Sequence, residues 1–343
     1  MKKKFIYAAL ASAMLLCSAC GKQDGASNSE TKTSNTANVS ATDAGTDTSN
    51  NDGTTNTNAS ENSTDGNAEP ADNTEQSISV SVDLQTEENN ETAEDGTSIY
   101  TSLIIYPVVS IEGNETAAEI INADIQSRVD AFRADTSALD MAKEDYEYTL
   151  TEESEYPFLG YESVLDFIVT RADSNVISFA VTYYEFSGGA HGNHTTIGVN
   201  YSPHTGELID FSELADDPDS FHADTLAFNL ALADNESYQE RLFPETSAEE
   251  VESALYADEK WYLSSSGLVF ISDPYMLGPY SSGDITFTIP YLNLEEMGLK
   301  EEYRYMGHPT TELEDGISYR MDINGDASIS YVDMTRGDAT DPI

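Results

Sequence analysis

A long stretch near the N-terminus restricts where this chain of 343 residues can fold. Residues 21–77 contain no Leu, Ile, Phe, Tyr, Trp or Met, and Val39 is their only large aliphatic residue. A chain so rich in Ser, Thr, Asn, Asp and Gly cannot bury enough apolar surface to offset the entropy cost of ordering. We therefore expect residues 20–77 to form a disordered tether and the folded part to begin at Ile78.

The first 19 residues have the pattern of a bacterial export signal. Three lysines at positions 2–4 precede the apolar run 5–16, which is shorter than the roughly 20 residues that span a bilayer. The small residues before Cys20 resemble a lipobox, in which the cysteine is acylated. Because Cys17 stands where a lipobox usually has leucine, ordinary cleavage after Ala19 with an unmodified Cys20 is the alternative. The favoured prediction is lipidation at Cys20, which would hold the protein on the extracytoplasmic face of the cell membrane.

Both cysteines of the chain lie in this N-terminal region, so the expected folded part contains none. An exported domain without disulfides must be stabilised by its own core. It also has no thiolate for a metal site or for nucleophilic catalysis.

Residues 78–297 alternate apolar runs with turns and predict an α+β fold. The strands and helices do not alternate with regular βαβ spacing. We therefore expect antiparallel sheets with two or three packed helices, arranged in two closely packed lobes, 78–195 and 196–297. The expected strands are 102–111 (a pair, or one strand broken at Pro107), 164–169, 176–186, 197–201, 260–263, 268–271 and 285–291.

Capping signals mark the expected helix starts. A capping box begins at Thr116, and a second one at Ser247 opens a short helix. Between them a helix over 221–232 is expected, with Asp219 or Ser220 as its cap. The first helix should bury a stripe with helical spacing, with Arg128 at its edge: Ala117, Ile121, Ile125 and Phe132.

The charge balance restricts the class of partner. The chain has 15 Lys+Arg against 63 Asp+Glu; without the three signal lysines its formal charge is −51. Nucleic acid is therefore excluded as a natural partner, since binding it requires cationic contacts to phosphate. A cationic protein would be attracted by this field. The alternative is that the acidity serves only solubility.

One segment resembles a known bacterial extracytoplasmic family. Residues 176–193 read Val-Ile-Ser-Phe-Ala-Val-Thr-Tyr-Tyr-Glu-Phe-Ser-Gly-Gly-Ala-His-Gly-Asn. They are similar to the family that supplies the outer domain of the lysozyme-sensing anti-sigma factor RsiV and the non-catalytic N-terminal module of the peptidoglycan deacetylase PdaC. The similarity continues through 199–214 and 261–291, the latter including Asp-Pro-Tyr-Met-Leu-Gly-Pro-Tyr-Ser-Ser-Gly at 273–283.

The resemblance implies a sensing or binding module rather than an enzyme. We expect neither the sigma-binding segment of the anti-sigma factor nor the catalytic domain of the deacetylase. The implied partner is a cationic wall-active protein such as lysozyme, or peptidoglycan itself. Because the same module is joined to different partners, it identifies the fold more firmly than the function.

The glycine-rich turn at 188–192 offers candidate site residues. His191, Asn193 and Tyr184 are the candidate binding residues. The favoured interpretation of the turn is structural: His191 points inward and hydrogen-bonds to close the loop, and Asn193 caps it. His191 and His194 could share a metal, but a zinc site needs further ligands. The alternative function is a cell-wall hydrolase or esterase in which His191 works with carboxylates, although the sequence shows no serine in a nucleophile elbow.

The C-terminal tail, residues 298–343, contains a second candidate site. Asp322, Asn324, Asp326 and Asp333 fall at positions 1, 3, 5 and 12 of a degraded calcium loop, with Ala327 where the looping glycine belongs. Calcium is the only cofactor that the sequence suggests. The favoured alternative is a hairpin of 317–321 against 328–332, turning at Asn324-Gly325.

Overall fold

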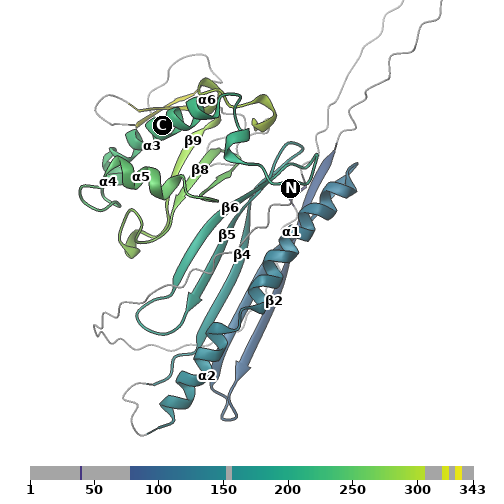
Figure 1. The fold of residues 1–343 in the computed structure, drawn as a ribbon, viewed down its shortest axis with the longest axis vertical. Helices are drawn as coiled ribbons and strands as arrows, with labels where there is room; N and C mark the ends of the chain where they lie inside the picture. Colours follow the sequence, from purple (N-terminus) through teal and green to yellow (C-terminus); the bar gives the residue numbers. More distant parts are fainter. Residues whose placement is uncertain (1–38, 41–77, 152–156, 306–318, 324–328, 334–343) are drawn as a thin grey trace, which may run out of the picture. The chain divides into compact units, whose positions relative to one another are not determined.

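The largest sheet runs in sequence order from β1 to β6. Figure 1 labels β2, β4, β5 and β6 of this sheet. The computed structural model describes residues 39–40, 78–151, 157–305, 319–323 and 329–333. Neighbouring strands are antiparallel except β3 and β4, which are parallel. The strands are β1 (Val39–Ser40), β2 (Ser79–Thr92), β3 (Ser98–Glu112), β4 (Tyr161–Ala172), β5 (Ile177–Phe186) and β6 (Asn193–Tyr201).

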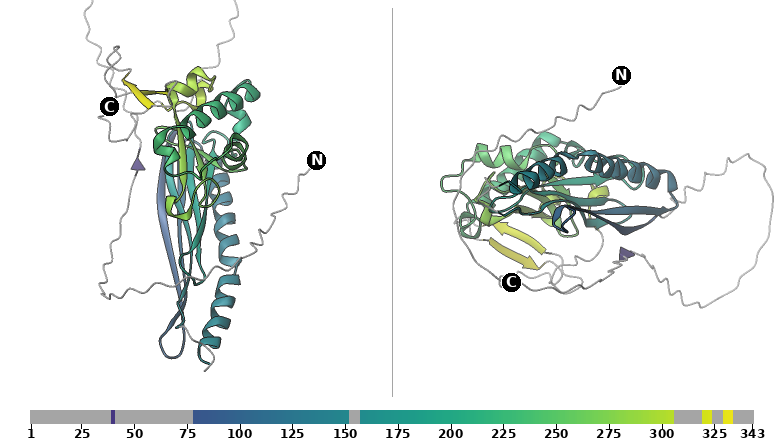
Figure 2. Two further views of the ribbon diagram at one scale, coloured as in Figure 1. Left: turned by 90° about the vertical axis from the view of Figure 1, so that its left-hand side faces the viewer. Right: turned by 90° about the horizontal axis from the view of Figure 1, so that it is seen from below.

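Two helices make the crossover that the parallel pair requires. They are α1 (Glu115–Ala134) and α2 (Ser137–Thr149), and both lie along one face of the sheet (Figures 1 and 2). The α+β class is confirmed, but this β3–α1–α2–β4 unit departs from the expectation of purely antiparallel sheets. The expected stripe of α1 is buried at Ala117, Ile121 and Ile125, and Val129 extends it.

The cap of α1 differs from the prediction. Asn114, not Thr116, is the N-cap, and its side-chain oxygen accepts from the Ala117 N–H. The Asn114 amide also donates to the carbonyls of Pro203 and His204. These contacts lie about 90 residues away in the sequence, so the local pattern could not indicate them.

Strand β3 passes through Pro107 without a break, contrary to the expected interruption. Its pairing with β4 ends at Ile105, so Pro107 lies where β3 has only β2 beside it. A proline is tolerated at such an edge because no ladder hydrogen bond needs its missing N–H. Just beyond, the Asn122 side chain of α1 bonds to both the N–H and the carbonyl of Val109 and so takes the place of a neighbouring strand.

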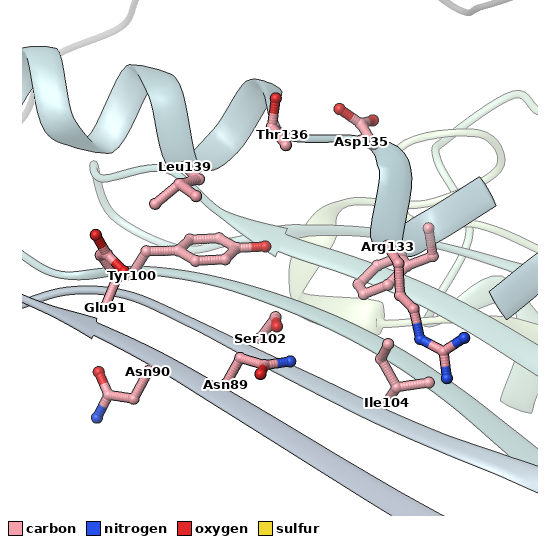
Figure 3. A pocket seen from close by; sticks show the side chains of 11 residues that line it. Asn89, Asn90, Glu91, Tyr100, Ser102, Ile104, Arg133, Asp135, Thr136 and Leu139 are labelled. Carbon is pink, nitrogen blue, oxygen red and sulfur yellow. The ribbon is translucent and has the colours of Figure 1, made fainter. Parts of the chain in front are cut away.

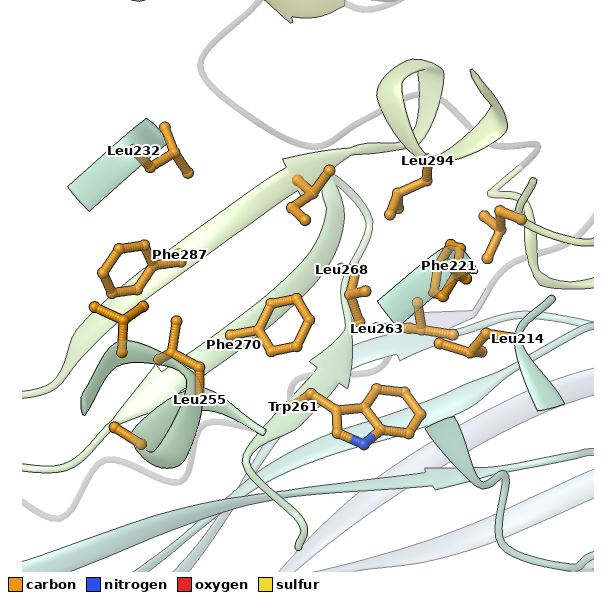
Figure 4. Close-up of a cluster of buried hydrophobic side chains, with 14 of the residues drawn as sticks. Leu214, Phe221, Leu232, Leu255, Trp261, Leu263, Leu268, Phe270, Phe287 and Leu294 are labelled. Atoms are coloured by element: carbon orange, nitrogen blue, oxygen red, sulfur yellow. The ribbon is translucent and has the colours of Figure 1, made fainter. Parts of the chain in front are cut away.

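The second part of the fold surrounds a three-stranded antiparallel sheet. Its core is shown in Figure 4 and includes Trp261, Phe270 and Phe287. The N-cap of α3 is Asp217 rather than Asp219 or Ser220, whereas the capping box at Ser247 is confirmed. The elements are α3 (Pro218–Ala233), α4 (Glu236–Gln239), α5 (Ala248–Leu255), β7 (Trp261–Leu263), β8 (Gly267–Ser272), β9 (Ile285–Pro290) and α6 (Tyr291–Glu296), with short 3-10 turns at 211–213, 280–282 and 301–303.

Strand β7 lies directly against β6. Gly198 donates its N–H to the Glu259 carbonyl at 2.7 Å, and a Cβ at Gly198 would lie 1.7 Å from the Trp261 carbonyl oxygen. The buried Asn200 side chain accepts from the Leu263 N–H and donates to the Trp261 carbonyl. The expected lobe boundary between 195 and 196 falls inside β6, so the first sheet extends to Tyr201.

A buried arginine ties the segment after α6 to the first sheet. The Arg171 side chain is fully buried; it pairs with Asp173 at 2.6 Å and donates to the carbonyls of Tyr303 and Arg304. Its guanidinium also lies over the rings of Tyr291 and Tyr305. Asp173 and these rings compensate the buried charge, as such a site requires.

In the tail, β10 (Tyr319–Ile323) and β11 (Ile329–Asp333) form an antiparallel hairpin. A hairpin is present as predicted, but its strands are 319–323 and 329–333 rather than 317–321 and 328–332; its turn, with Asn324 and Asp326, lies outside the described residues. The register places Asp322 opposite Ser330 and Asp333 opposite Tyr319, three residue pairs apart along the ladder. Calcium binding stays a prediction. The export signal, Cys20 and nearly all of the tether also lie outside the described residues.

Candidate functional site

The β5–β6 loop, residues 187–192, positions the residues singled out by the sequence. Gly188 and Gly189 have φ of +89° and +87°, the left-handed conformation that glycine adopts without strain. Gly192 leaves room for the Tyr184 ring, since a Cβ there would lie 2.5 Å from it. Burial raises the pKa of the Tyr184 phenol, and the charge of Glu162 adds to the shift.

His191 is fixed by hydrogen bonds to both of its ring nitrogens. Nδ1 lies 2.9 Å from the Gly192 carbonyl oxygen, which can only accept, so Nδ1 carries the proton. In the neutral ring Nε2 is then an acceptor, and the Tyr275 hydroxyl donates to it at 3.1 Å. The imidazole also stacks on the Tyr280 ring, with centroids 3.7 Å apart and planes 13° from parallel.

Tyr275 and Tyr280 belong to the loop between β8 and β9, which is anchored on β6 at both ends. At one end Asp273 accepts from the Thr196 N–H and the Thr195 hydroxyl, and it pairs with Lys260 at 2.5 Å. At the other end Asp284 lies 2.9 Å from the Nε2 of His194, within hydrogen-bond distance, and accepts from the Thr196 hydroxyl.

The middle of this loop is also held in place. Leu277 is buried in the second core, and its carbonyl accepts from the Phe243 N–H. Gly278 passes so close to the Arg241 carbonyl oxygen that a Cβ would lie 2.2 Å from it. The loop is therefore a firmly built structure.

Between these anchors the loop exposes its apolar residues. Tyr275 is 55% exposed and Met276 57% exposed. Tyr275 also has φ of +70°, a conformation that costs a residue with a side chain roughly 1–2 kcal/mol. Strained backbone conformations of this kind are found most often at ligand-binding sites. They persist only where the surrounding structure holds them in place. We call His191, Tyr275, Met276 and Tyr280 the aromatic surface.

The structure corrects the predicted orientation of His191. The side chain is exposed rather than turned inward, although it does close the loop through Gly192. Asn193 is exposed too, as the first residue of β6 opposite Glu185. Tyr184 lies across from His194 in the register and half-buried beside Gly192.

The histidines do not share a metal site. His191 bonds to Tyr275 and His194 to Asp284, while both rings contact Tyr280. Among the described residues no group of three or more His, Cys, Asp and Glu side chains could hold a metal ion. The partner of the His191 Nε2 is a phenol, whereas a hydrolase of the alternative kind would need a carboxylate or a nucleophile there.

Two family models match the chain, and each includes one of the two loops that meet at the aromatic surface. One is described as "Deacetylase PdaC" and matches residues 93–194, which end in the β5–β6 hairpin. The other is described as "Protein of unknown function (DUF3298)" and matches residues 222–292, which include the β8–β9 loop. The chain carries a PdaC domain followed by a DUF3298 domain. The family resemblance is thereby confirmed, and it indicates an extracytoplasmic module.

Two solved structures are similar to part of this chain. A DUF3298 family member from Bacteroides fragilis is 18% identical, and the match covers 64% of this chain and 94% of that one, with a TM-score of 0.43. A DUF3298 family protein from Pseudomonas aeruginosa is 16% identical, with 65% and 95% covered and a TM-score of 0.42. No curated protein matches the chain. Within the described ranges, no helix is long and apolar enough to cross a bilayer.

Proposed function

We propose that the PdaC and DUF3298 domains form a non-catalytic binding module, held outside the cell membrane by a lipid on Cys20. Its partner is a cationic wall-active protein of the lysozyme kind, and the aromatic surface is its principal contact. The single observation that carries this proposal is Tyr275, an exposed ring on strained backbone that His191 and Tyr280 hold in one orientation. Tyrosines fixed in this way supply much of the energy of protein interfaces.

The distribution of charge supports a cationic partner. Each lysine and arginine whose side chain the structure describes is already bound within the fold. The chain as a whole has 63 Asp+Glu against 15 Lys+Arg, and the field of this negative charge attracts a basic protein. The pairs are Arg128 with Asp124 and Glu259, Arg133 with Glu87 and Asp130, Lys143 with Glu91, Arg171 with Asp173, Lys260 with Asp273, Lys300 with Asp216 and Arg304 with Glu295, while Arg241 bonds to two backbone carbonyls.

The two features have different roles. Exposed charges speed the encounter and are screened by salt, with a Debye length of about 8 Å at physiological ionic strength. The aromatic surface provides contacts that salt does not screen. Binding by this mechanism should weaken with salt without disappearing.

Calorimetric titration with hen lysozyme at low and at physiological salt tests the proposal. Tyr275→Ala should weaken binding by tenfold or more at both salt concentrations. Tyr148→Ala is the matched control, because Tyr148 is also 55% exposed but lies on α2. Absence of binding by the unaltered protein at both salt concentrations would refute the proposal, and binding that vanished at physiological salt would reduce it to unspecific charge attraction.

A further inference from the structure

A cavity of about 430 Å³ opens beneath the bend between α1 and α2, over β2 and β3 (Figure 3). Helix α1 ends at Ala134, Asp135 is extended, and α2 begins at Ser137, so the helical cover is interrupted there. The volume lies in the range of small-molecule sites. The lining comes from β2 (Asn89, Asn90, Glu91), β3 (Tyr100, Ser102, Ile104), α1 (Phe132, Arg133), the bend (Asp135, Thr136) and α2 (Leu139).

The sheet beneath this bend carries a row of polar residues. The register pairs Asn89 with Ser102, Ser102 with Ser163, Ser163 with Glu185, and Glu185 with Asn193. Paired residues share one face, so these five lie side by side across β2 to β6. The neighbouring row holds Ile104 and Leu165, both buried under α1. This polar row lies on the helix-covered face, at the break between α1 and α2, and the packing of the core does not explain it.

The charged groups at the cavity are already compensated within the fold. Arg133 pairs with Glu87 and Asp130, both at 2.6 Å. Glu91 pairs with Lys143. Asp135 accepts from the N–H and the hydroxyl of Ser137.

The groups left for a ligand are neutral. Asn89, Tyr100 and Ser102 have no hydrogen bond from their side chains to another described residue. They offer an amide, a phenol and a hydroxyl, which both donate and accept. Figure 3 shows the Tyr100 ring projecting into the space between α2 and the strands. The site therefore combines neutral hydrogen-bonding groups with the rings of Tyr100 and Phe132.

We propose that this cavity binds a saccharide unit. A pyranose presents neighbouring hydroxyls that an amide and hydroxyls can bind in pairs, and its C–H face packs against an aromatic ring. A lysine or arginine side chain would meet carboxylates that already have partners, and an anion would meet an arginine held by two carboxylates. The site uses none of the residues of the aromatic surface, so it is a second binding function of the module.

Saturation-transfer NMR and calorimetry on the full-length chain with Cys20→Ser test this proposal. The probes are triacetylchitotriose, maltotriose and a lysine-rich peptide. The only tryptophan, Trp261, is buried in the second core, so its fluorescence is not a suitable signal. We expect at least one saccharide to bind, and a preference for the first probe would identify the acetamido group as part of the recognised unit.

Two variants place the binding in the cavity. Asn89→Ala removes one exposed amide and should weaken saccharide binding about three- to tenfold. Ser102→Leu fills the cavity and should abolish it; melting curves verify that each variant is folded. Gln85→Ala, an exposed residue of the same strand outside the lining, should leave binding unchanged. The proposal is overturned if neither saccharide binds, if both cavity variants bind like the unaltered protein, or if only the peptide binds.

Discussion

The left-handed backbone of Tyr275 should lower the stability of the fold, and this strain energy can be measured by substitution. If φ of +70° is imposed on this residue, glycine should fit the position better than alanine. Both variants lose the bond to His191 and the ring contacts with Tyr280, so the difference between them isolates the backbone. Glycine avoids roughly 1–2 kcal/mol of strain but loses about 0.5–1 kcal/mol more chain entropy on folding. The Gly variant should therefore be roughly 0.75 kcal/mol more stable than the Ala variant, the midpoint of a difference of about 0–1.5 kcal/mol.

For a fold of this size that difference corresponds to a melting temperature about 1–4 °C higher for Tyr275→Gly than for Tyr275→Ala. Met276 is the control, because it is equally exposed but has no positive φ. There the order should reverse, with Met276→Ala more stable than Met276→Gly. Both Tyr275 variants should bind lysozyme weakly, since both lack the ring. An Ala variant at least as stable as the Gly variant at position 275 would refute the claim that strain is stored there.

Three further substitutions test other parts of the account. Gly198→Ala should lower the free energy of unfolding in urea by at least about 2 kcal/mol, because its Cβ would meet the Trp261 carbonyl. A loss below 0.5 kcal/mol, roughly the level of a surface substitution, would contradict the close contact between β6 and β7. Arg171→Leu should cost about 3 kcal/mol, since it leaves Asp173 unpaired, and an unchanged unfolding midpoint would show that the buried pair contributes nothing. Burial raises the pKa of Glu185, the nearby charge of Asp135 raises it further, and a hydrogen bond from Ser187 lowers it in part. Because the folded pKa lies above the unfolded one, the ionised form of Glu185 destabilises the fold at pH values above the unfolded pKa. Glu185→Gln should thus melt above the unaltered protein at pH 7 and equal it near pH 3.5, and equal melting at both pH values would contradict the shift.

Much of the fold could be predicted from apolar spacing, because burial of one face dictates that spacing. The α1 stripe, the strands β5 and β9 and the box at Ser247 were all expected and are all present, although β5 is buried on both faces in its first half. Among the missed elements are β2, whose second half is mostly exposed, the short helices α4 and α6, and α2, whose buried residues are only Ala138 and Ala142. Small residues give a weak periodic signal, and this helix is positioned mainly by the crossover that it completes.

The candidate site could be predicted only in part. His191 was visible in its glycine-rich turn, and the segment 273–283 was visible as a second part of the family resemblance. The ring of His191 stacks on Tyr280, which lies 89 residues later in the sequence. This contact depends on the hydrogen bonds that Asp273 and Asp284 make to residues of β6. No spacing in the sequence encodes such a contact. The parallel pairing of β3 with β4, which aligns the polar row, was hidden for the same reason.

Hydrogen–deuterium exchange of the full-length chain with and without saturating lysozyme tests the central claim most directly. The account predicts slower exchange on binding in residues 187–192 and 273–284, which carry the aromatic surface. The α1–α2 bend should exchange as before, because it belongs to the separate saccharide site. Bound lysozyme that left both loops unchanged while protecting another region would contradict the assignment of the binding surface.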